Sequence, residues 1–241
     1  MALPKCRLPL PAPLWLWLVA VSKPPRIPVP GEELWSTGLG SCPGGIANLA
    51  TALARLGLRT GLVAGFGDDT YADWIWETLL EQEHINLASS PRYENFHTSL
   101  TVAVTVEGDR AMVTHGHDLP ESLSSYILAA PASRTAVVDL GGETYWWDEL
   151  KSRGTALFAD IGFDISGRWD PAVLHPLRHC QAFTPNAVEA MAYTRTDSPN
   201  QAVRKLADRV PLAVVTDGIG GAYAIDQNTG EEAWCPAVTV E

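Results

Sequence analysis

The sequence predicts an α/β protein with a mostly parallel central sheet, flanking helices and a small β lid. Three observations support this prediction. Short apolar runs alternate with helix-length amphipathic segments along most of the chain, as in βαβ units. One hairpin instead alternates apolar with polar residues, which a sheet buried on both faces does not favour. The 241 residues are 46% apolar, which suffices for one large core.

The amino-terminal segment, residues 1–29, allows two interpretations. Basic residues precede an apolar run at 14–21, which is too short to span a bilayer as a helix. This outline is typical of a signal peptide, but residues 15–21 also fit a first strand of the sheet after a disordered leader. We favour the strand, because nothing downstream suggests secretion, and assign residues 30–241 to one domain.

Helical and strand-like segments follow in alternation. A helix at 45–56 carries apolar residues at the i, i+3, i+4 and i+7 positions, and Gly57 follows it as a typical helix-ending residue. Further helices are expected at 73–82, 145–153, 171–177, 187–193 and 201–209. Short strands are expected at 62–64, 136–140, 156–160, 181–183, 212–216 and 222–225.

The segment at about 98–116 differs from these strands. Apolar and polar residues alternate from Leu100 to Val106, a turn follows at 107–110, and the pattern returns. We therefore expect a lid hairpin outside the main sheet, whose exposed strands would allow a homodimer. His115 and His117 share a face of this hairpin, and we interpret them as a surface pair rather than a metal site.

The charge of the chain excludes one class of partner. Lys and Arg total 17 against 28 Asp and Glu, so the formal net charge is −11. A protein that binds nucleic acid needs a basic surplus, and this chain has none. A nucleotide-binding enzyme remains compatible, because backbone N–H groups and local cations can hold phosphates. We expect a small-molecule partner, with no nucleic acid and no membrane.

Three glycine-rich or polar clusters lie where strands are expected to end, the edge at which open α/β sheets bind ligands. In the first, Gly44 and Gly45 precede a helix and Asn48 lies one turn later. Glycines at a helix start let a ligand approach the backbone N–H groups, and the Asn amide suits a sugar hydroxyl. The same residues also fit a simple glycine turn before a helix.

The second and third clusters each allow two interpretations as well. Asn186 and Glu189 fit either a capping box or a Mg²⁺–phosphate site at a helix start. Thr216, Gly218 and Gly221 follow an apolar strand and fit either a nucleotide-phosphate turn or a tight hairpin. No Lys follows these glycines, so the third cluster is not a P-loop.

Taken together and in this order, the clusters resemble the ribokinase-like PfkB family of sugar and nucleoside kinases, from about residue 30 to residue 241. The segment Pro43-Gly44-Gly45-Ile46-Ala47-Asn48 is the clearest match, and the turn Gly65-Phe66-Gly67-Asp68-Asp69 supports it. Asn186-x-x-Glu189 and Thr216-x-Gly218-x-x-Gly221 lie where the family carries its metal–phosphate and nucleotide motifs.

The resemblance implies a ribokinase-like fold and a cytoplasmic carbohydrate kinase that uses ATP and Mg²⁺. It implies that the substrate is bound by Gly44, Gly45, Asn48 and Glu143. It implies that the nucleotide is bound by Asn186, Thr216, Gly218 and Gly221. It implies that Glu189 organises the metal.

The chain departs from the family at the catalytic step. The family's Gly-Ala-Gly-Asp stretch, whose Asp is the general base, would begin beyond Glu241, so we assign no catalytic residue. The family's substrate-binding Asp is also missing from residues 18–21. Loss of a general base costs about 10²–10⁴ in rate. We therefore expect an impaired kinase; the alternative is an inactive sugar- or nucleotide-binding relative with a regulatory role.

Overall fold

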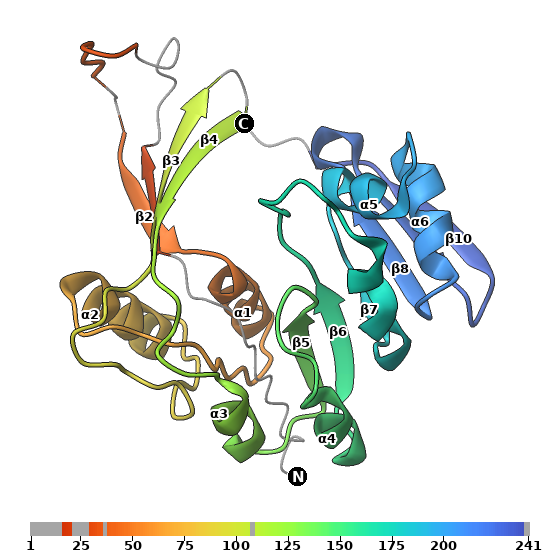
Figure 1. Ribbon diagram of the computed structural model, residues 1–241, viewed down its shortest axis with the longest axis horizontal. Helices are drawn as coiled ribbons and strands as arrows, with labels where there is room; N and C mark the ends of the chain where they lie inside the picture. The colour runs from red at the N-terminus through yellow and green to blue at the C-terminus, as the bar shows by residue number, and fades with distance from the viewer. Residues whose placement is uncertain (1–15, 21–28, 36–37, 107–108, 239–241) are drawn as a thin grey trace. The chain divides into compact units, whose positions relative to one another are not determined.

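The computed structural model describes the chain in two compact units, residues 1–131 and 132–241 (Figure 1). The described residues are 16–20, 29–35, 38–106 and 109–238. The predicted leader before residue 16, residues 21–28 and 36–37, the tip of the predicted hairpin turn at 107–108 and the last three residues lie outside them. None of the described helices is long and apolar enough to cross a membrane.

The first unit contains a four-stranded sheet in the order β2-β1-β3-β4. Its strands are β1 (Leu16–Ala20), β2 (Gly40–Pro43), β3 (Leu100–Val106) and β4 (Asp109–His115). β3 and β4 form an antiparallel hairpin, so the predicted hairpin outside the main sheet is confirmed. The predicted first strand forms, but its expected place in the main sheet is wrong, because β1 pairs in parallel with β3. An apolar run predicts a strand and leaves its pairing partner undetermined.

Helix α1 (Ile46–Arg55) confirms the first predicted helix and buries Ala47 and Ala50. Gly57 adopts a φ of 85°, and the N–H of Leu58 donates to the carbonyl of Leu53 at 3.1 Å. This is the pattern by which a left-handed glycine ends a helix. The predicted strand at 62–64 is wrong in detail: these residues are buried, but among the described residues they form an isolated bridge at Val63 rather than a continuous strand. Two further isolated bridges lie nearby, Gly61 with Asn86 and Phe66 with Arg92.

Helix α2 (Thr70–Glu77) continues into a π-helical turn, η1 (Thr78–Gln82), and confirms the predicted helix with an earlier start. The start is set by Asp69, whose carboxylate accepts the N–H of Ala72 at 2.9 Å and that of Thr98. Asp69 therefore caps the helix and also ties it to the segment that leads into β3. A short helix, α3 (Ser124–Ala129), was not predicted.

The second unit contains a six-stranded sheet in the order β10-β9-β8-β7-β6-β5. β5 to β8 are mutually parallel, and β9 and β10 join antiparallel at one edge. The strands are β5 (Thr135–Asp139), β6 (Ala156–Asp160), β7 (Ala182–Phe183), β8 (Leu212–Thr216), β9 (Ala222–Asp226) and β10 (Glu231–Cys235). The mostly parallel sheet is confirmed, whereas β10 was not predicted.

The helices of the second unit also agree with the sequence. They are α4 (Trp147–Ser152), the 3₁₀ segment η2 (Pro171–His179), α5 (Ala187–Thr194) and α6 (Pro199–Ala207). α6 packs against β8 and β9, and its inward face buries Val203 and Leu206. Burial of these apolar side chains stabilises the packing of the helix on the sheet. The polar residues lie instead at the ends of the strands.

Replacing Asp69 with Ala should lower the free energy of unfolding by about 1–2 kcal/mol, because an N-cap and a second N–H acceptor are lost together. Urea unfolding followed by circular dichroism measures this change. Thr70→Ala, one residue later and exposed, is the matched control and should change stability by less than about 0.5 kcal/mol. Equal effects of the two substitutions would contradict the assignment of the cap.

Candidate functional site

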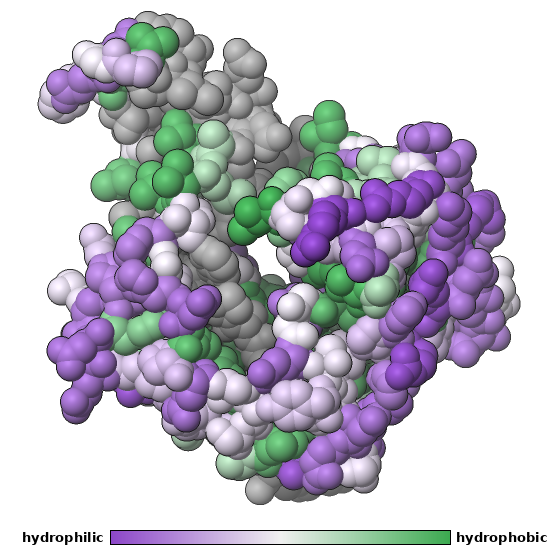
Figure 2. All heavy atoms as spheres, in the orientation of Figure 1, coloured by the Kyte–Doolittle hydropathy of each residue, from purple (hydrophilic) through white to green (hydrophobic). Residues whose placement is uncertain are grey.

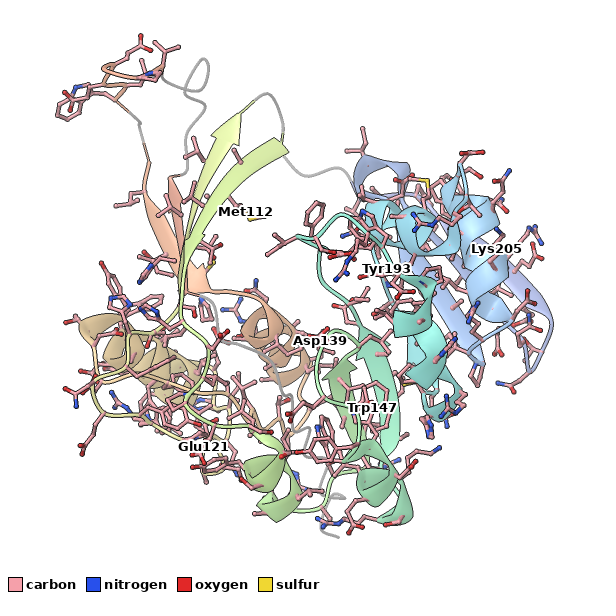
Figure 3. All side chains as sticks on the ribbon, viewed as in Figure 1. Met112, Glu121, Asp139, Trp147, Tyr193 and Lys205 are labelled. Atoms are coloured by element: carbon pink, nitrogen blue, oxygen red, sulfur yellow. The ribbon has the colours of Figure 1, made fainter. Side chains whose placement is uncertain are left out.

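Polar residues gather at the carboxyl ends of the parallel strands in the second unit. β5 ends at Asp139 and β6 ends at Asp160, while Asn186 begins α5 after β7 and Thr216 ends β8. Figure 3 labels Asp139 at the end of β5. Parallel strands bring these residues to one edge of the sheet, where open α/β folds bind ligands.

Asn186 and Glu189 form a reciprocal capping box at the start of α5. The N–H of Glu189 donates to Oδ1 of Asn186 at 2.9 Å, and the N–H of Asn186 donates to Oε2 of Glu189 at 3.1 Å. The capping-box interpretation of the Asn186–Glu189 spacing is therefore confirmed. The box also holds the Glu189 side chain inward, so that the residue is only 6% exposed.

Burial and like charge act together on this carboxylate. Desolvation raises the pKa of Glu189 to about 7, the two N–H interactions with Asn186 oppose it, and the charges of Asp160 and Asp139 add to it. Desolvation likewise raises the pKa of Asp160 to about 6, and Asp139 contributes. The pKa of Asp139 is raised by burial too, against a hydrogen bond from Gly141. The edge therefore holds three carboxyl groups that disfavour one another's ionisation.

Asp139 and Asp160 are site residues that sequence reasoning missed. Each is the last residue of an apolar strand, and the two strands are neighbours in parallel register. The signal was present in the sequence, since both strands read as apolar runs that end in Asp. What the sequence did not show is that the carboxylates of these residues lie close enough to Glu189 to affect its pKa.

The Thr216–Gly221 turn lies directly beside the capping box. The N–H of Thr216 donates to the carbonyl of Pro185 at 3.1 Å, and Thr216 forms an isolated bridge with Asn186. The structure thus brings together the second and third predicted clusters. The turn contains a short 3₁₀ segment, η3 (Gly218–Gly220), and leads into β9.

Two glycines of this turn are required for different reasons. Gly221 has a φ of 90°, and a Cβ there would overlap the carbonyl of Cys235. Gly218 has a φ of 51° and open space where a Cβ would lie. Gly221 is therefore required by close approach as well as by conformation, whereas Gly218 is required by conformation alone.

A cleft of about 760 Å³ borders Asp139, and Gly141 and residues 161–166 also contribute to its lining. Arg168 and Arg195 line it too, and the guanidinium of Arg195 donates to the carbonyls of Arg168 and Trp169 at 2.7 and 3.1 Å. The cleft combines acidic and basic groups with backbone polar groups, a composition suited to a polar ligand.

The other predicted substrate residues lie elsewhere in the chain. Gly45 precedes α1 with a φ of 53°, Gly44 is buried, and the Asn48 side chain is exposed, all in the first unit. Glu143 is exposed in the loop after β5, in the second unit. Among the predicted site residues, the structure places Asn186, Glu189 and Thr216 next to one another, with Gly218 and Gly221 in the following turn.

The histidines of the hairpin have a neighbour that the sequence did not show. The ring of His115 lies 4.9 Å from that of His117 and 5.4 Å from that of His97, centre to centre. Within the described part of the chain, no group of three or more His, Cys, Asp or Glu side chains is placed to hold a metal ion directly.

The carboxylates nevertheless fit a magnesium ion bound through water. Mg²⁺ keeps several of its waters and takes only one or two protein carboxylates. Oε2 of Glu189 accepts the N–H of Asn186, so the carboxylate is held in place at the start of α5, where it would hold such an ion through water. A nearby cation would lower the raised pKa values of these buried carboxyl groups.

Comparison with known proteins gives a family and a fold. The pfkB family of carbohydrate kinases matches residues 38–240. No curated protein sequence matches the chain significantly. Three similar solved structures are a putative ribokinase II from E. coli, an Arabidopsis thaliana ribokinase complexed with ribose and ATP, and phosphofructokinase-2 from Escherichia coli with substrates and products.

These structures are 15%, 16% and 19% identical to the chain, with TM-scores of 0.75, 0.71 and 0.74. The matches cover 99%, 98% and 99% of this chain and 80%, 79% and 80% of the respective neighbours. At this identity they show the fold alone. The expected ribokinase-like α/β fold is confirmed.

Replacing Glu189 with Gln should flatten the dependence of stability on pH. Between the ordinary value of 4.5 and about 7, the unfolded chain releases the Glu189 proton while the folded chain keeps it. The free energy of unfolding should therefore fall as pH rises through this window in the wild type, and fall less in E189Q. Urea unfolding at a series of pH values tests this, with the exposed Glu81→Gln as control. Parallel curves for E189Q and the wild type would contradict the burial of a raised-pKa carboxyl group.

Gly221→Ala should lower the free energy of unfolding by at least about 2 kcal/mol, because the new Cβ meets the Cys235 carbonyl in a backbone conformation unsuited to Ala. Gly218→Ala should cost only about 1 kcal/mol, since its Cβ would enter open space. Chemical unfolding of the two variants side by side measures the difference. A larger loss for G218A would show that the described approach of Cys235 is incorrect.

Proposed function

Because the chain belongs to the pfkB family of carbohydrate kinases, we propose that it transfers the γ-phosphate of ATP to a hydroxyl group of a sugar. One observation supports the proposal most: the bridge between Asn186 and Thr216. It joins the two clusters expected to bind nucleotide at one edge of the sheet, so that one ligand can contact both.

The proposed nucleotide site consists of Asn186, Thr216, Gly218 and Gly221. The glycines let phosphate oxygens approach the turn without a side chain in the way. An acidic protein can bind a phosphate in this manner, because the donors are backbone N–H groups rather than Lys or Arg side chains. The Arabidopsis thaliana ribokinase, which is complexed with ribose and ATP, supports ATP as the phosphate donor.

Glu189 would hold Mg²⁺ through water, with Asp160 and Asp139 completing the acidic surroundings. A bound ion would supply positive charge to neutralise the transferring phosphate. Negative charge on the carboxyl groups would favour a cation beside the triphosphate. Their burial keeps bulk water away from them, which strengthens every charge interaction there.

Gly44, Gly45 and Asn48, at the start of α1 in the first unit, are proposed to contact the sugar, and the amide of Asn48 offers both an NH₂ donor and a carbonyl acceptor to a hydroxyl group. Glu143, in the second unit, is proposed separately as a further sugar contact. A phosphoryl transfer needs positioning more than covalent help, so these contacts would contribute mainly by orienting the acceptor hydroxyl.

A polypeptide of these 241 residues should transfer phosphate slowly. It contains no Gly-Ala-Gly-Asp stretch, and we assign no general base within it. A second candidate function is that of a sugar- or nucleotide-binding relative that acts by regulation rather than turnover. A cytoplasmic location, where ATP is available, remains part of the first proposal.

A homodimer through the lid is also proposed. Val102 and Val113 lie opposite each other in the hairpin and are 41% and 76% exposed. Figure 2 shows hydrophobic side chains on this part of the first unit. Exposed apolar strand faces favour pairing with a second sheet of the same kind.

Titration calorimetry with ADP and Mg²⁺, and separately with a panel of sugars, tests the proposed function. The wild-type polypeptide should bind ADP and at least one sugar, with ATP-dependent sugar phosphorylation near background. Asn48→Ala should weaken sugar binding by about tenfold or more, because two hydrogen-bonding groups are lost, and leave ADP binding unchanged. Asn228→Ala, in an exposed turn, is the matched control.

Three results would contradict the proposal in different ways. Failure to bind any nucleotide would remove the kinase assignment and the nucleotide-binding alternative together. Nucleotide binding with no affinity for any sugar would overturn the sugar site alone. Rapid turnover by the 241-residue polypeptide would show that a general base lies within it.

A further inference from the structure

We propose that Trp234, on β10, is a positioning residue for the nucleotide, because its indole holds the Thr216–Gly221 turn in place. The inference rests on the proposed function, which assigns the nucleotide to this turn. Trp234 lies on a strand that was not predicted from the sequence, and it is not a residue of any of the three clusters described above.

A side-chain hydrogen bond links Trp234 to the turn. Its Nε1–H donates to the carbonyl of Gly220 at 3.1 Å. The antiparallel pairing of β10 with β9 sets this contact, since Trp234 lies opposite Tyr223, three residues after Gly220. The indole therefore reaches back along the hairpin to the turn that precedes β9.

The backbone of β10 touches the same turn one residue later. The carbonyl of Cys235 occupies the space where a Cβ of Gly221 would lie. Trp234 and Cys235 thus contact Gly220 and Gly221 in succession, one through a side chain and one through the backbone. The turn is held from outside at the point where it enters β9.

A glycine-rich turn needs such external contacts. Gly218 and Gly221 have φ values of 51° and 90°, and glycine loses more conformational freedom on ordering than any other residue. Three internal hydrogen bonds close the turn: the N–H groups of Gly220, Gly221 and Asp217 donate to the carbonyls of Asp217, Gly218 and Gly221 at 2.7, 3.1 and 2.8 Å. None of these three bonds uses the carbonyl of Gly220, which accepts from Trp234 instead. A ligand that binds a preformed turn avoids the cost of ordering it, so a contact that preforms the turn increases affinity.

The exposure of Trp234 argues against a role in the core. The side chain is 57% exposed, whereas buried packing tryptophans of this chain such as Trp147 are 1% exposed. Removing the indole N–H while keeping an aromatic ring should therefore affect the turn more than the stability of the unit.

Trp234→Phe tests the inference in the full 241-residue chain. It removes the N–H donor and keeps an aromatic ring, and Trp35→Phe, at a side chain that is 86% exposed in the other unit, is the matched control. ADP affinity is measured by calorimetry with Mg²⁺ present. Hydrogen exchange of residues 217–221 is measured without any nucleotide.

The Kd for ADP should rise about 3- to 10-fold in W234F and stay unchanged in W35F, the range expected for one lost hydrogen bond. Exchange at 217–221 should become faster by a similar factor, with the thermal midpoint and sugar affinity unchanged. A Kd that rises while exchange stays as in the wild type would overturn the positioning role.

Wild-type affinity in W234F would overturn this inference and leave the proposed function intact. Absence of ADP binding by the wild type would overturn the proposed function, and the inference with it. A fall in the thermal midpoint and in sugar affinity of W234F as large as the loss of ADP affinity would also overturn it, because Trp234 would then be a general stabilising residue.

Discussion

A carboxylate buried beside two others is the constraint on which the candidate site depends. The capping box that starts α5 draws Glu189 inward, and the parallel pairing of β5 with β6 places Asp139 and Asp160 nearby. The capping box and the pairing of β5 with β6 each form through ordinary local hydrogen bonds. Together they place three carboxyl groups in a buried region with little water. Such an arrangement favours either bound protons or a cation, and a cation beside a triphosphate is what phosphoryl transfer requires.

The proposed nucleotide site depends on backbone groups rather than on charged side chains. The Thr216–Gly221 turn joins the capping box through Thr216, and β10 supports it through Gly220 and Gly221. This arrangement explains how a chain with a net charge of −11 can be expected to bind ATP. Backbone donors carry no charge of their own, so the acidic surface and a phosphate site are compatible.

Local sequence patterns predicted most elements and failed where pairing is long-range. Helices α1, α5 and α6 follow from amphipathic periodicity and caps, which lie within the segments themselves. The partner of β1, the isolated bridges near residues 61–66 and the existence of β10 depend on contacts between distant segments. The same distinction applies to the site: the spacing of Asn186 and Glu189 was readable, whereas the effect of Asp160 on Glu189 was not, because it arises only when two strands align.

Glu189 is a buried carboxyl group, and a bound cation would restore its ionisation. The most direct test is a nuclear magnetic resonance titration of the Glu189 side-chain carbonyl carbon, without and with Mg²⁺ and ADP. We expect a pKa of about 7 for Glu189 in the free protein and a clear decrease when both ligands are present. A pKa near the ordinary glutamate value in the free protein, or one that the ligands leave unchanged, would contradict it.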